Sequence, residues 1–305
     1  MRYGILLWLA ALSFHCSNTE NGGAAETTAA APSHAESPAI EVTIQGTTPG
    51  QAYLIGFQED RQLRADSAMV DADGKVVFQR RAPYDPGLYY LLLPNRSSLQ
   101  LLIDTDQTFT LRTQAGNPVQ QMQVSGSREN DLLYQNLKFE AGYASRYRAI
   151  SRQLQNLDPS RPAYTELQTQ REQLVAERQA HLQEIFDAYP DAFFTSFKRA
   201  GQNPAARDVR RPDGSVDKPR QVYLFRSEYW DGVDFTDERL LRTPVIINKL
   251  KQYITEMTAQ HPDSLIAATD MLMQKVPDGS PYYRFFANWI PLQYEPGNTT
   301  MMDGE

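Results

Sequence analysis

The chain has 305 residues, of which 41% are hydrophobic and 22% charged, and its formal net charge is -7. This composition is ordinary for a soluble globular protein, and the length suffices for two domains of usual size. The negative charge argues against nucleic acid as a partner and against polybasic attachment to anionic lipid, because both need a basic protein face.

The first fifteen residues have the pattern of a secretory signal. Arg2 precedes a short apolar run, residues 5–12, which is too short to span a bilayer. The only cysteine of the chain, Cys16, follows closely. We interpret residues 1–15 as a lipoprotein signal peptide, with cleavage before Cys16 and lipidation of its thiol. Ordinary secretion with an unmodified Cys16 and an intracellular chain are the alternatives.

Lipidation of Cys16 has two consequences. The mature chain would contain no free thiol, and therefore no disulfide and no thiol redox chemistry of its own. The lipid would also be its only membrane attachment, because no second apolar stretch approaches 18 residues. Residues 16–38 are polar, without apolar periodicity, and are predicted to form a flexible tether. The predicted location is the cell envelope, in the outer membrane facing the periplasm.

Residues 39–126 show short apolar segments separated by turn residues. About eight such segments at regular spacing predict an antiparallel β-sandwich. The strongest turn signal is Asp71-Ala72-Asp73-Gly74, which predicts a hairpin between residues 67–70 and 75–78. The same four residues are similar to the start of a calcium loop, but its closing glutamate is missing, so a turn is preferred.

Residues 127–200 change to a helical period. Two long helices over 129–157 and 162–189, separated by a proline-containing break, predict an antiparallel hairpin, followed by a short third helix near Phe193. The residues expected to be buried in the hairpin seam are Leu137, Leu154, Leu174 and Ile185. Residues 201–220 are predicted to be a solvated polar loop, because aspartates interrupt its basic residues.

Residues 221–305 predict a C-terminal helical module. Thr236 is expected to cap one turn, Pro244 to begin the next helix, Asp263 to cap another, and Ser280-Pro281 to begin a final aromatic helix. The predicted fold class is therefore α+β: an N-terminal antiparallel β-sandwich, then a long helical hairpin and a C-terminal helical module.

Two stretches carry a family resemblance. In residues 39–134 the features are Asp66-Ser67-Ala68, Asp73-Gly74-Lys75 ahead of Phe78, Pro86-Gly87-Leu88-Tyr89, and Gly126-Ser127 before Glu129-Asn130. In residues 221–305 they are sharper: Tyr229-Trp230-Asp231, the run from Phe235 to Pro244, Lys249, Tyr253 and Pro262-Asp263-Ser264. On these features the chain resembles the N-terminal β domain and the following helical domain, both of unknown function, of Gram-negative thioredoxin-like thiol:disulfide interchange lipoproteins.

The resemblance implies an accessory role beside a thioredoxin-like domain or protein. In that architecture a thioredoxin-like domain with a Cys-x-x-Cys site follows, whereas this chain has no such pair. We expect a chain truncated or split before the catalytic domain. The missing domain would pack near residues 282–294, because a final helix this aromatic would otherwise expose an apolar patch.

Motifs for catalysis or metal binding are not found in the sequence. His34, His181 and His261 lack ligand spacing, and Ser125-Gly126-Ser127 lacks the glycine spacing of a nucleophile elbow. No glycine-rich phosphate loop is present. We therefore expect no metal, no cofactor and no enzymatic activity.

The candidate functional residues are Cys16 for lipidation and, for docking a partner, Trp230, Asp231, Arg239, Arg242, Phe286 and Trp289. The charged stretch around Arg239 has two interpretations, a docking surface or helix capping with an internal salt-bridge set, and the second is preferred. The aromatic residues of the last third could form a peptide or glycan groove, but helical spacing favours a core. The alternative functions are a small-molecule, peptide or glycan-binding envelope lipoprotein and, less favoured, a hydrolase without a recognisable motif.

Overall fold

The computed structural model describes residues 37–205 and 207–295. The predicted signal peptide, Cys16 and most of the predicted tether lie outside these residues. In the part that is described, none of the helices combines the length and the apolar character needed to cross a bilayer.

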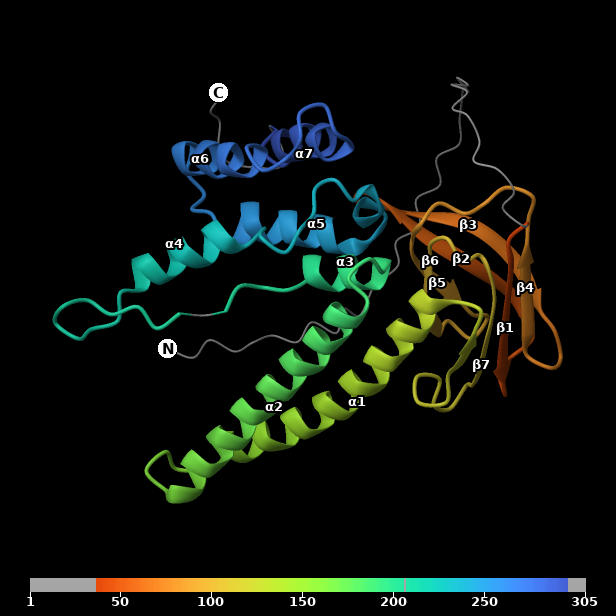
Figure 1. Cartoon of the computed structure of the whole chain (residues 1–305), viewed down its shortest axis with the longest axis horizontal. Helices are drawn as coiled ribbons and strands as arrows, with labels where there is room; N and C mark the ends of the chain where they lie inside the picture. Colours follow the sequence, from red (N-terminus) through yellow and green to blue (C-terminus); the bar gives the residue numbers. More distant parts are fainter. Residues whose placement is uncertain (1–36, 206, 296–305) are drawn as a thin grey trace. The chain divides into compact units, whose positions relative to one another are not determined.

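The predicted α+β fold class is confirmed, with a two-sheet β region followed by helices (Figure 1). One sheet has the order β4 (Lys75–Gln79), β1 (Ala39–Gln45), β7 (Thr108–Gln114) and β8 (Gln123–Ser125). The other has the order β3 (Arg61–Val70), β2 (Gly50–Gln58), β5 (Gly87–Leu92) and β6 (Ser98–Ile103). All neighbouring strands are antiparallel except β1 and β7, which run parallel from Ala39 opposite Thr108.

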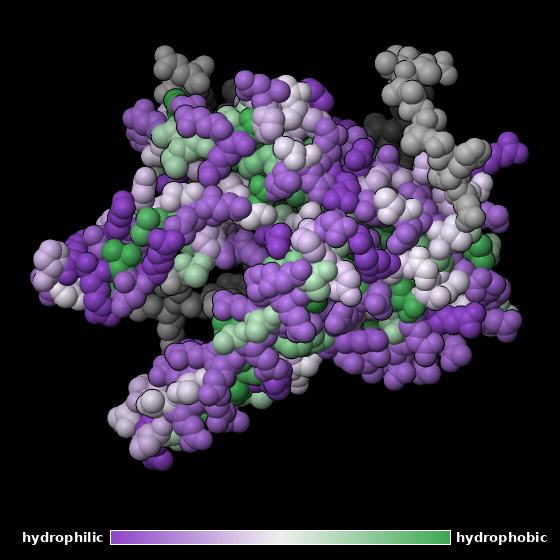
Figure 2. Space-filling view, in the orientation of Figure 1, coloured by the Kyte–Doolittle hydropathy of each residue, from purple (hydrophilic) through white to green (hydrophobic). Residues whose placement is uncertain are grey.

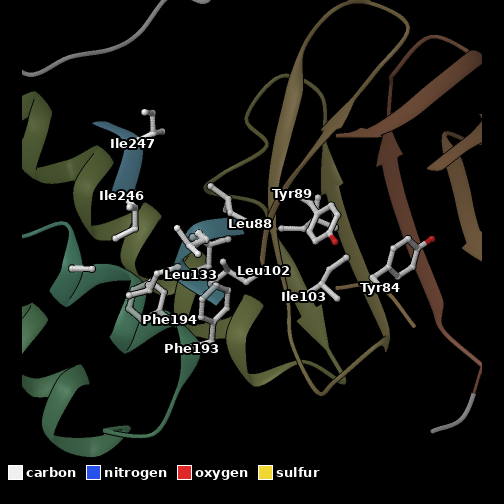
Figure 3. Close-up of a cluster of buried hydrophobic side chains, with 14 of the residues drawn as sticks. Tyr84, Leu88, Tyr89, Leu102, Ile103, Leu133, Phe193, Phe194, Ile246 and Ile247 are labelled. Carbon is white, nitrogen blue, oxygen red and sulfur yellow. The ribbon is translucent and has the colours of Figure 1, made fainter. Parts of the chain in front are cut away.

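The sandwich core follows strand alternation, and one sheet is covered on both faces. In β1, Ile40, Val42 and Ile44 are buried in turn. In β6, by contrast, the consecutive residues Leu101 to Ile103 are all buried. Figure 3 shows the reason: Leu102 points towards Leu133 and Phe193 of the helices, whereas Ile103 points the other way. This second apolar layer places the helices directly on the β5–β6 face.

The prediction of a β-hairpin around residues 71–74 is wrong, although the turn itself forms. The Asp71 carboxylate accepts hydrogen bonds from the backbone N–H groups of Asp73 and Lys75, each at 2.9 Å. Gly74 has a φ of 78°, and a Cβ there would lie 2.1 Å from the Ile44 carbonyl oxygen. However, β3 and β4 belong to different sheets, and β4 pairs with β1. The turn therefore connects the two layers of the sandwich.

Two long helices, α1 (Arg128–Gln155) and α2 (Pro162–Ala188), form the predicted hairpin. Leu154, Leu174 and Ile185 are buried, and Leu137 is partly buried against the core. The seam prediction is thus confirmed for three residues, with Leu137 only partly covered. The short helix α3 (Phe193–Ala200) follows, and α4 (Lys218–Glu228) begins inside the segment predicted to be a polar loop.

The C-terminal module consists of short helical pieces. They are η1 (Glu238–Arg242), α5 (Pro244–Lys251), η2 (Gln252–Glu256), α6 (Pro262–Met273) and α7 (Pro281–Leu292). Pro244 opens α5 and Ser280 caps α7, as predicted. Two predicted caps are wrong. Asp237 rather than Thr236 caps η1, because the Thr236 hydroxyl donates instead to the Asp234 carboxylate at 2.7 Å. The α6 helix begins at Pro262 after His261, so Asp263 lies in its first turn rather than at the cap.

The aromatic face of α7 is buried within the module. Tyr282, Phe286 and Trp289 are all buried. The Phe286 ring lies 6.0 Å from that of Trp230, and the Tyr282 ring lies 5.3 Å from that of Phe235. The expectation that this helix would expose an uncovered aromatic patch is therefore wrong, because residues earlier in the same module cover it.

Candidate functional site

An ion-pair network joins the end of β6 to η1. The Arg239 guanidinium donates to the Asp104 carboxylate at 2.9 Å and to both carboxylate oxygens of Asp237 at 2.8 Å. Its carbon also lies 4.9 Å from the centre of the Phe193 ring. Burial by itself would raise the pKa of Asp237, but the hydrogen bonds and charge of Arg239 outweigh it and lower that pKa. This is the internal salt-bridge arrangement preferred from the sequence.

The Gly126-Ser127 and Glu129-Asn130 motif joins three elements. The Asn130 side chain donates to the Leu102 carbonyl at 2.7 Å and accepts from the Leu102 N–H at 2.9 Å. Ser127 caps α1 by accepting from the Asn130 N–H, and the buried Glu129 carboxylate accepts from the Phe194 N–H at 2.7 Å. The motif therefore fastens α1 to β6 and to the start of α3.

The contact between the sandwich and η1 is close. The Glu59 N–H donates to the Leu241 carbonyl at 2.7 Å. A Cβ on Gly87 would lie 2.8 Å from both the Cβ and the carbonyl oxygen of Arg242. Gly87 is thus needed for η1 to lie against the start of β5, and this contact determines where the Arg242 side chain projects.

A cleft of about 240 Å³ opens at this contact. It is lined by residues of both the sandwich and η1. The sandwich contributes residues of β2, β3, the β4–β5 connection and β5, and η1 contributes a single arginine. Its titratable lining residues are Arg64, Arg80, Tyr84, Asp85, Tyr89 and Arg242.

Two tyrosines form the fixed walls of the cleft. The Tyr84 hydroxyl donates to the Asp66 carboxylate at 2.5 Å, and the Tyr89 hydroxyl donates to the Asp85 carbonyl at 2.7 Å. A Cβ on Gly56 would lie 2.8 Å from the Tyr89 ring, so the missing side chain makes room for it. Burial is the larger cause, and the hydrogen bond to Asp66 the smaller one, of a raised pKa for Tyr84. Burial also raises the pKa of Tyr89, to about 12. Both hydroxyls therefore remain protonated donors at neutral pH.

The cleft carries an excess of positive charge. Arg80 lies 4.7 Å over the Tyr84 ring and Arg64 lies 5.8 Å from the Tyr53 ring. Within residues 37–205 and 207–295, neither guanidinium forms an ion pair. Among the described residues, the Arg242 guanidinium pairs with the Asp85 carboxylate alone, at 3.9 Å, and the Asp85 side chain is 75% exposed. The lining thus contains three arginines and one loosely paired carboxylate, Asp85. A second carboxylate, Asp66, accepts the hydrogen bond of the Tyr84 hydroxyl.

The predicted docking residues do not come together in one place. Trp230, Phe286 and Trp289 are core residues, and Trp289 also lines a second, smaller hollow beside the β2–β3 turn. Asp231 is exposed and pairs with Lys275 at 3.1 Å. Of the six, Arg239 lies in the ion-pair network and Arg242 lies in the cleft. Their docking role stays a prediction.

Lys249 is a site residue that the sequence flagged only through the family resemblance. Its side chain is buried, with Nζ 3.9 Å from the centre of the Tyr229 ring, and it donates to the Gln202 carbonyl at 3.1 Å. In the part of the chain that the structure describes it has no carboxylate partner. Burial lowers the pKa of Lys249 to about 8.

The surface of α4 is apolar in part. This helix contains no buried residue, and Val222 and Tyr223 are more than half exposed, with Val216 exposed just before it. Figure 2 shows patches of hydrophobic surface among polar neighbours in the region of α4. Metal binding is a separate question: among all the described residues, no group of three or more His, Cys, Asp or Glu side chains is arranged to hold a metal ion.

Comparison with known families gives two matches. Residues 39–133 match a domain of unknown function, DUF4369. Residues 210–304 match a second domain of unknown function, DUF5106. No curated protein and no solved structure matches the chain. The cleft therefore combines Arg242 of the second matched region with residues of the first.

Proposed function

We propose that this chain is a non-catalytic, lipid-anchored module of the cell envelope that assists a thioredoxin-like thiol:disulfide oxidoreductase system. The order of the two matched domains supports this, because the resemblance found in the sequence concerns the same kinds of domain in the same order. The anchor of the proposed protein is the lipid on Cys16, in the outer membrane facing the periplasm.

The observation that carries the accessory role is the exposed apolar face of α4. A docking module exposes apolar side chains that its partner covers. Val222 and Tyr223 meet this description, and they lie on a helix without a fully buried residue, of which Phe225 is partly buried against the core. We propose that this face contacts the thioredoxin-like partner.

The partner contact is tested with a thioredoxin-like protein encoded beside this gene. Binding of the purified partner to the wild-type chain and to a Val222→Ser, Tyr223→Ser double variant is measured by calorimetry. The double variant should bind at least about tenfold more weakly, since two apolar side chains leave the interface. Ile266→Ser, which changes an exposed apolar residue of α6, is the matched control. Equal binding by wild type and double variant would refute the α4 contact.

The anchor and the absence of redox activity have separate tests. Metabolic labelling with a fatty-acid analogue should label the wild-type chain and not Cys16→Ser, and an unlabelled wild type would contradict lipidation. The cysteine-free fragment, residues 17–305, should reduce insulin no faster than buffer, because exchange needs a thiolate. Activity in that fragment would contradict a non-catalytic role.

The arginine-lined cleft favours a second candidate function, a ligand-binding envelope lipoprotein. Clefts with an apolar wall and a few converging polar groups are the usual form of small-ligand sites. The cleft between β2, β3, β5 and η1 has this form, with two tyrosines as walls and three arginines in its lining.

A further inference from the structure

We infer that the cleft lined by Arg64, Arg80 and Arg242 binds a small organic anion, a carboxylate or a phosphate ester that carries an apolar group. This inference rests on the second candidate function and does not depend on the thioredoxin-linked role. Nothing in the two matched domains, whose function is unknown, assigns a ligand to this place.

The charge of the ligand follows from the guanidinium groups. Each guanidinium presents N–H donors in a planar fork that matches carboxylate and phosphate oxygens. The Arg80 guanidinium lies over the Tyr84 ring of the cleft, and the Arg64 guanidinium lies near the Tyr53 ring, which is not part of the lining. Neither forms an ion pair within the described residues. Arg242 is held only at 3.9 Å by Asp85, so an anion entering the cleft can replace that exposed partner.

The apolar part of the ligand follows from the walls. Phe57, Leu63 and the rings of Tyr84 and Tyr89 line the same cleft as the arginines. A volume of about 240 Å³ is below the usual range for drug-sized ligands, which suits a ligand with one ring or a short alkyl group. Both tyrosine hydroxyls already donate within the protein, so the rings offer apolar faces rather than additional donors.

The site is preorganised by contacts between the two matched regions. The close approach at Gly87 and the hydrogen bond from Glu59 to Leu241 hold η1 in place, and η1 carries Arg242. The hydrogen bond from Tyr84 to Asp66 fixes the ring over which Arg80 lies. Groups held in place before binding lose less entropy when the ligand arrives. The complete site therefore needs both regions.

The test uses the mature chain, residues 16–305 with Cys16→Ser, and three probes measured by titration calorimetry. The probes are phenylacetate, phenyl phosphate and the neutral phenylacetamide. We expect at least one anion to bind with a Kd of about 1 mM or tighter, and the amide about tenfold more weakly. Comparing phenylacetate with phenyl phosphate separates a carboxylate from a phosphate ligand, and either preference supports the inference.

Four variants locate the binding. Arg64→Gln, Arg80→Gln and Arg242→Gln should each weaken binding about three- to tenfold, since each removes one set of charge-assisted hydrogen bonds. Arg81→Gln is the matched control, because Arg81 is the exposed neighbour of Arg80 and does not line the cleft. Arg64 lies on an exposed part of β3, so its variant should fold even if Arg242→Gln does not.

Removing the competing carboxylate provides an independent measurement. Asp85→Asn should tighten anion binding about two- to threefold, because Arg242 then loses the carboxylate with which it pairs in the described residues. The inference is overturned if the amide binds as tightly as both anions, if no anion binds, or if Arg81→Gln weakens binding as much as Arg80→Gln. None of these outcomes bears on lipidation of Cys16 or on the α4 contact.

Discussion

The β-sandwich and the C-terminal helical module bury their cores in different ways. The sandwich buries alternating aliphatic residues, such as Ile40, Val42 and Leu54, on strands that are also joined by backbone hydrogen bonds. The module packs a few large rings, with Trp230 in contact with Tyr253 and Phe286. Short helices gain little stability by themselves, so the module depends on those rings. The comparison shows that stability in the module is concentrated in a few side chains.

The largest expected loss of stability tests whether a few aromatic rings support the module. Trp230→Ala should lower the free energy of unfolding by about 3–5 kcal/mol, because it leaves a cavity among four other rings. Leu54→Ala, at an equally buried position of the sandwich, should cost about 2–4 kcal/mol. Urea unfolding followed by circular dichroism measures both. A loss under about 1 kcal/mol for Trp230→Ala would show that the rings are not the main support of the module.

The next largest loss of stability is expected at the ion-pair network between the sandwich and η1. Arg239→Met should cost about 2–4 kcal/mol, because Asp104 and Asp237 would remain partly buried without a cation. The Arg239 side chain is 28% exposed, which keeps the cost below that of a fully buried pair. Arg242→Met, whose nearest carboxylate is 3.9 Å away, should cost under about 1 kcal/mol. Equal losses in urea unfolding would mean that the network is not a buried one.

The helical hairpin provides an intermediate case. Leu154 is buried near the end of α1 but does not belong to the main hydrophobic core. Leu154→Ala should therefore cost about 2 kcal/mol, at the low end for a buried leucine. A loss under about 0.5 kcal/mol in urea unfolding would show that this part of the seam is open to solvent.

The smallest expected effect depends on pH. The pKa of Lys249, about 8, lies below its ordinary value of 10.5, so between these values the unfolded chain binds the proton more strongly. The destabilisation is complete below pH 8 and is relieved as the pH rises towards 10.5. At about 1.4 kcal/mol per pKa unit, these two values give a gain in stability of about 2 kcal/mol between pH 8 and 10. Thermal unfolding at several pH values measures it.

Lys249→Met is the control for that titration, because it keeps the length of the side chain and removes the proton. The stability of the wild type relative to Lys249→Met should increase between pH 8 and 10. A constant difference over this range would mean that the amine is neutral throughout or reaches solvent.

Much of the fold could be predicted because its signals are local. The alternation in β1, the continuous apolar run of β5 and the stripes of α1 and α2 each follow from the period of one element. The turn at residues 71–74 was found for the same reason, since Asp71 and Gly74 form it between near neighbours. The strands on either side of this turn were predicted to pair as one hairpin, whereas in the structure they belong to two different sheets.

The candidate site was only partly accessible to such reasoning. Arg242 was singled out, but as part of a charged stretch together with Arg239. Arg64 and Arg80 were not, because nothing in their neighbourhood in the sequence distinguishes them from other surface arginines. Gly56 and Gly87 are informative only once the Tyr89 ring and η1 are in place beside them.

The sequence by itself determined the strands, the helical hairpin and the absence of a second cysteine, because periodicity, turn residues and residue counts are properties of short segments or of the chain as a whole. The tertiary structure alone decided that α7 is covered by its own module, that Arg239 pairs with Asp104 of the sandwich, and that three distant arginines line one cleft. Those features bring together residues up to 178 positions apart, as with Arg64 and Arg242, which line the same cleft. No local pattern encodes such contacts, because they form only when the whole core is packed.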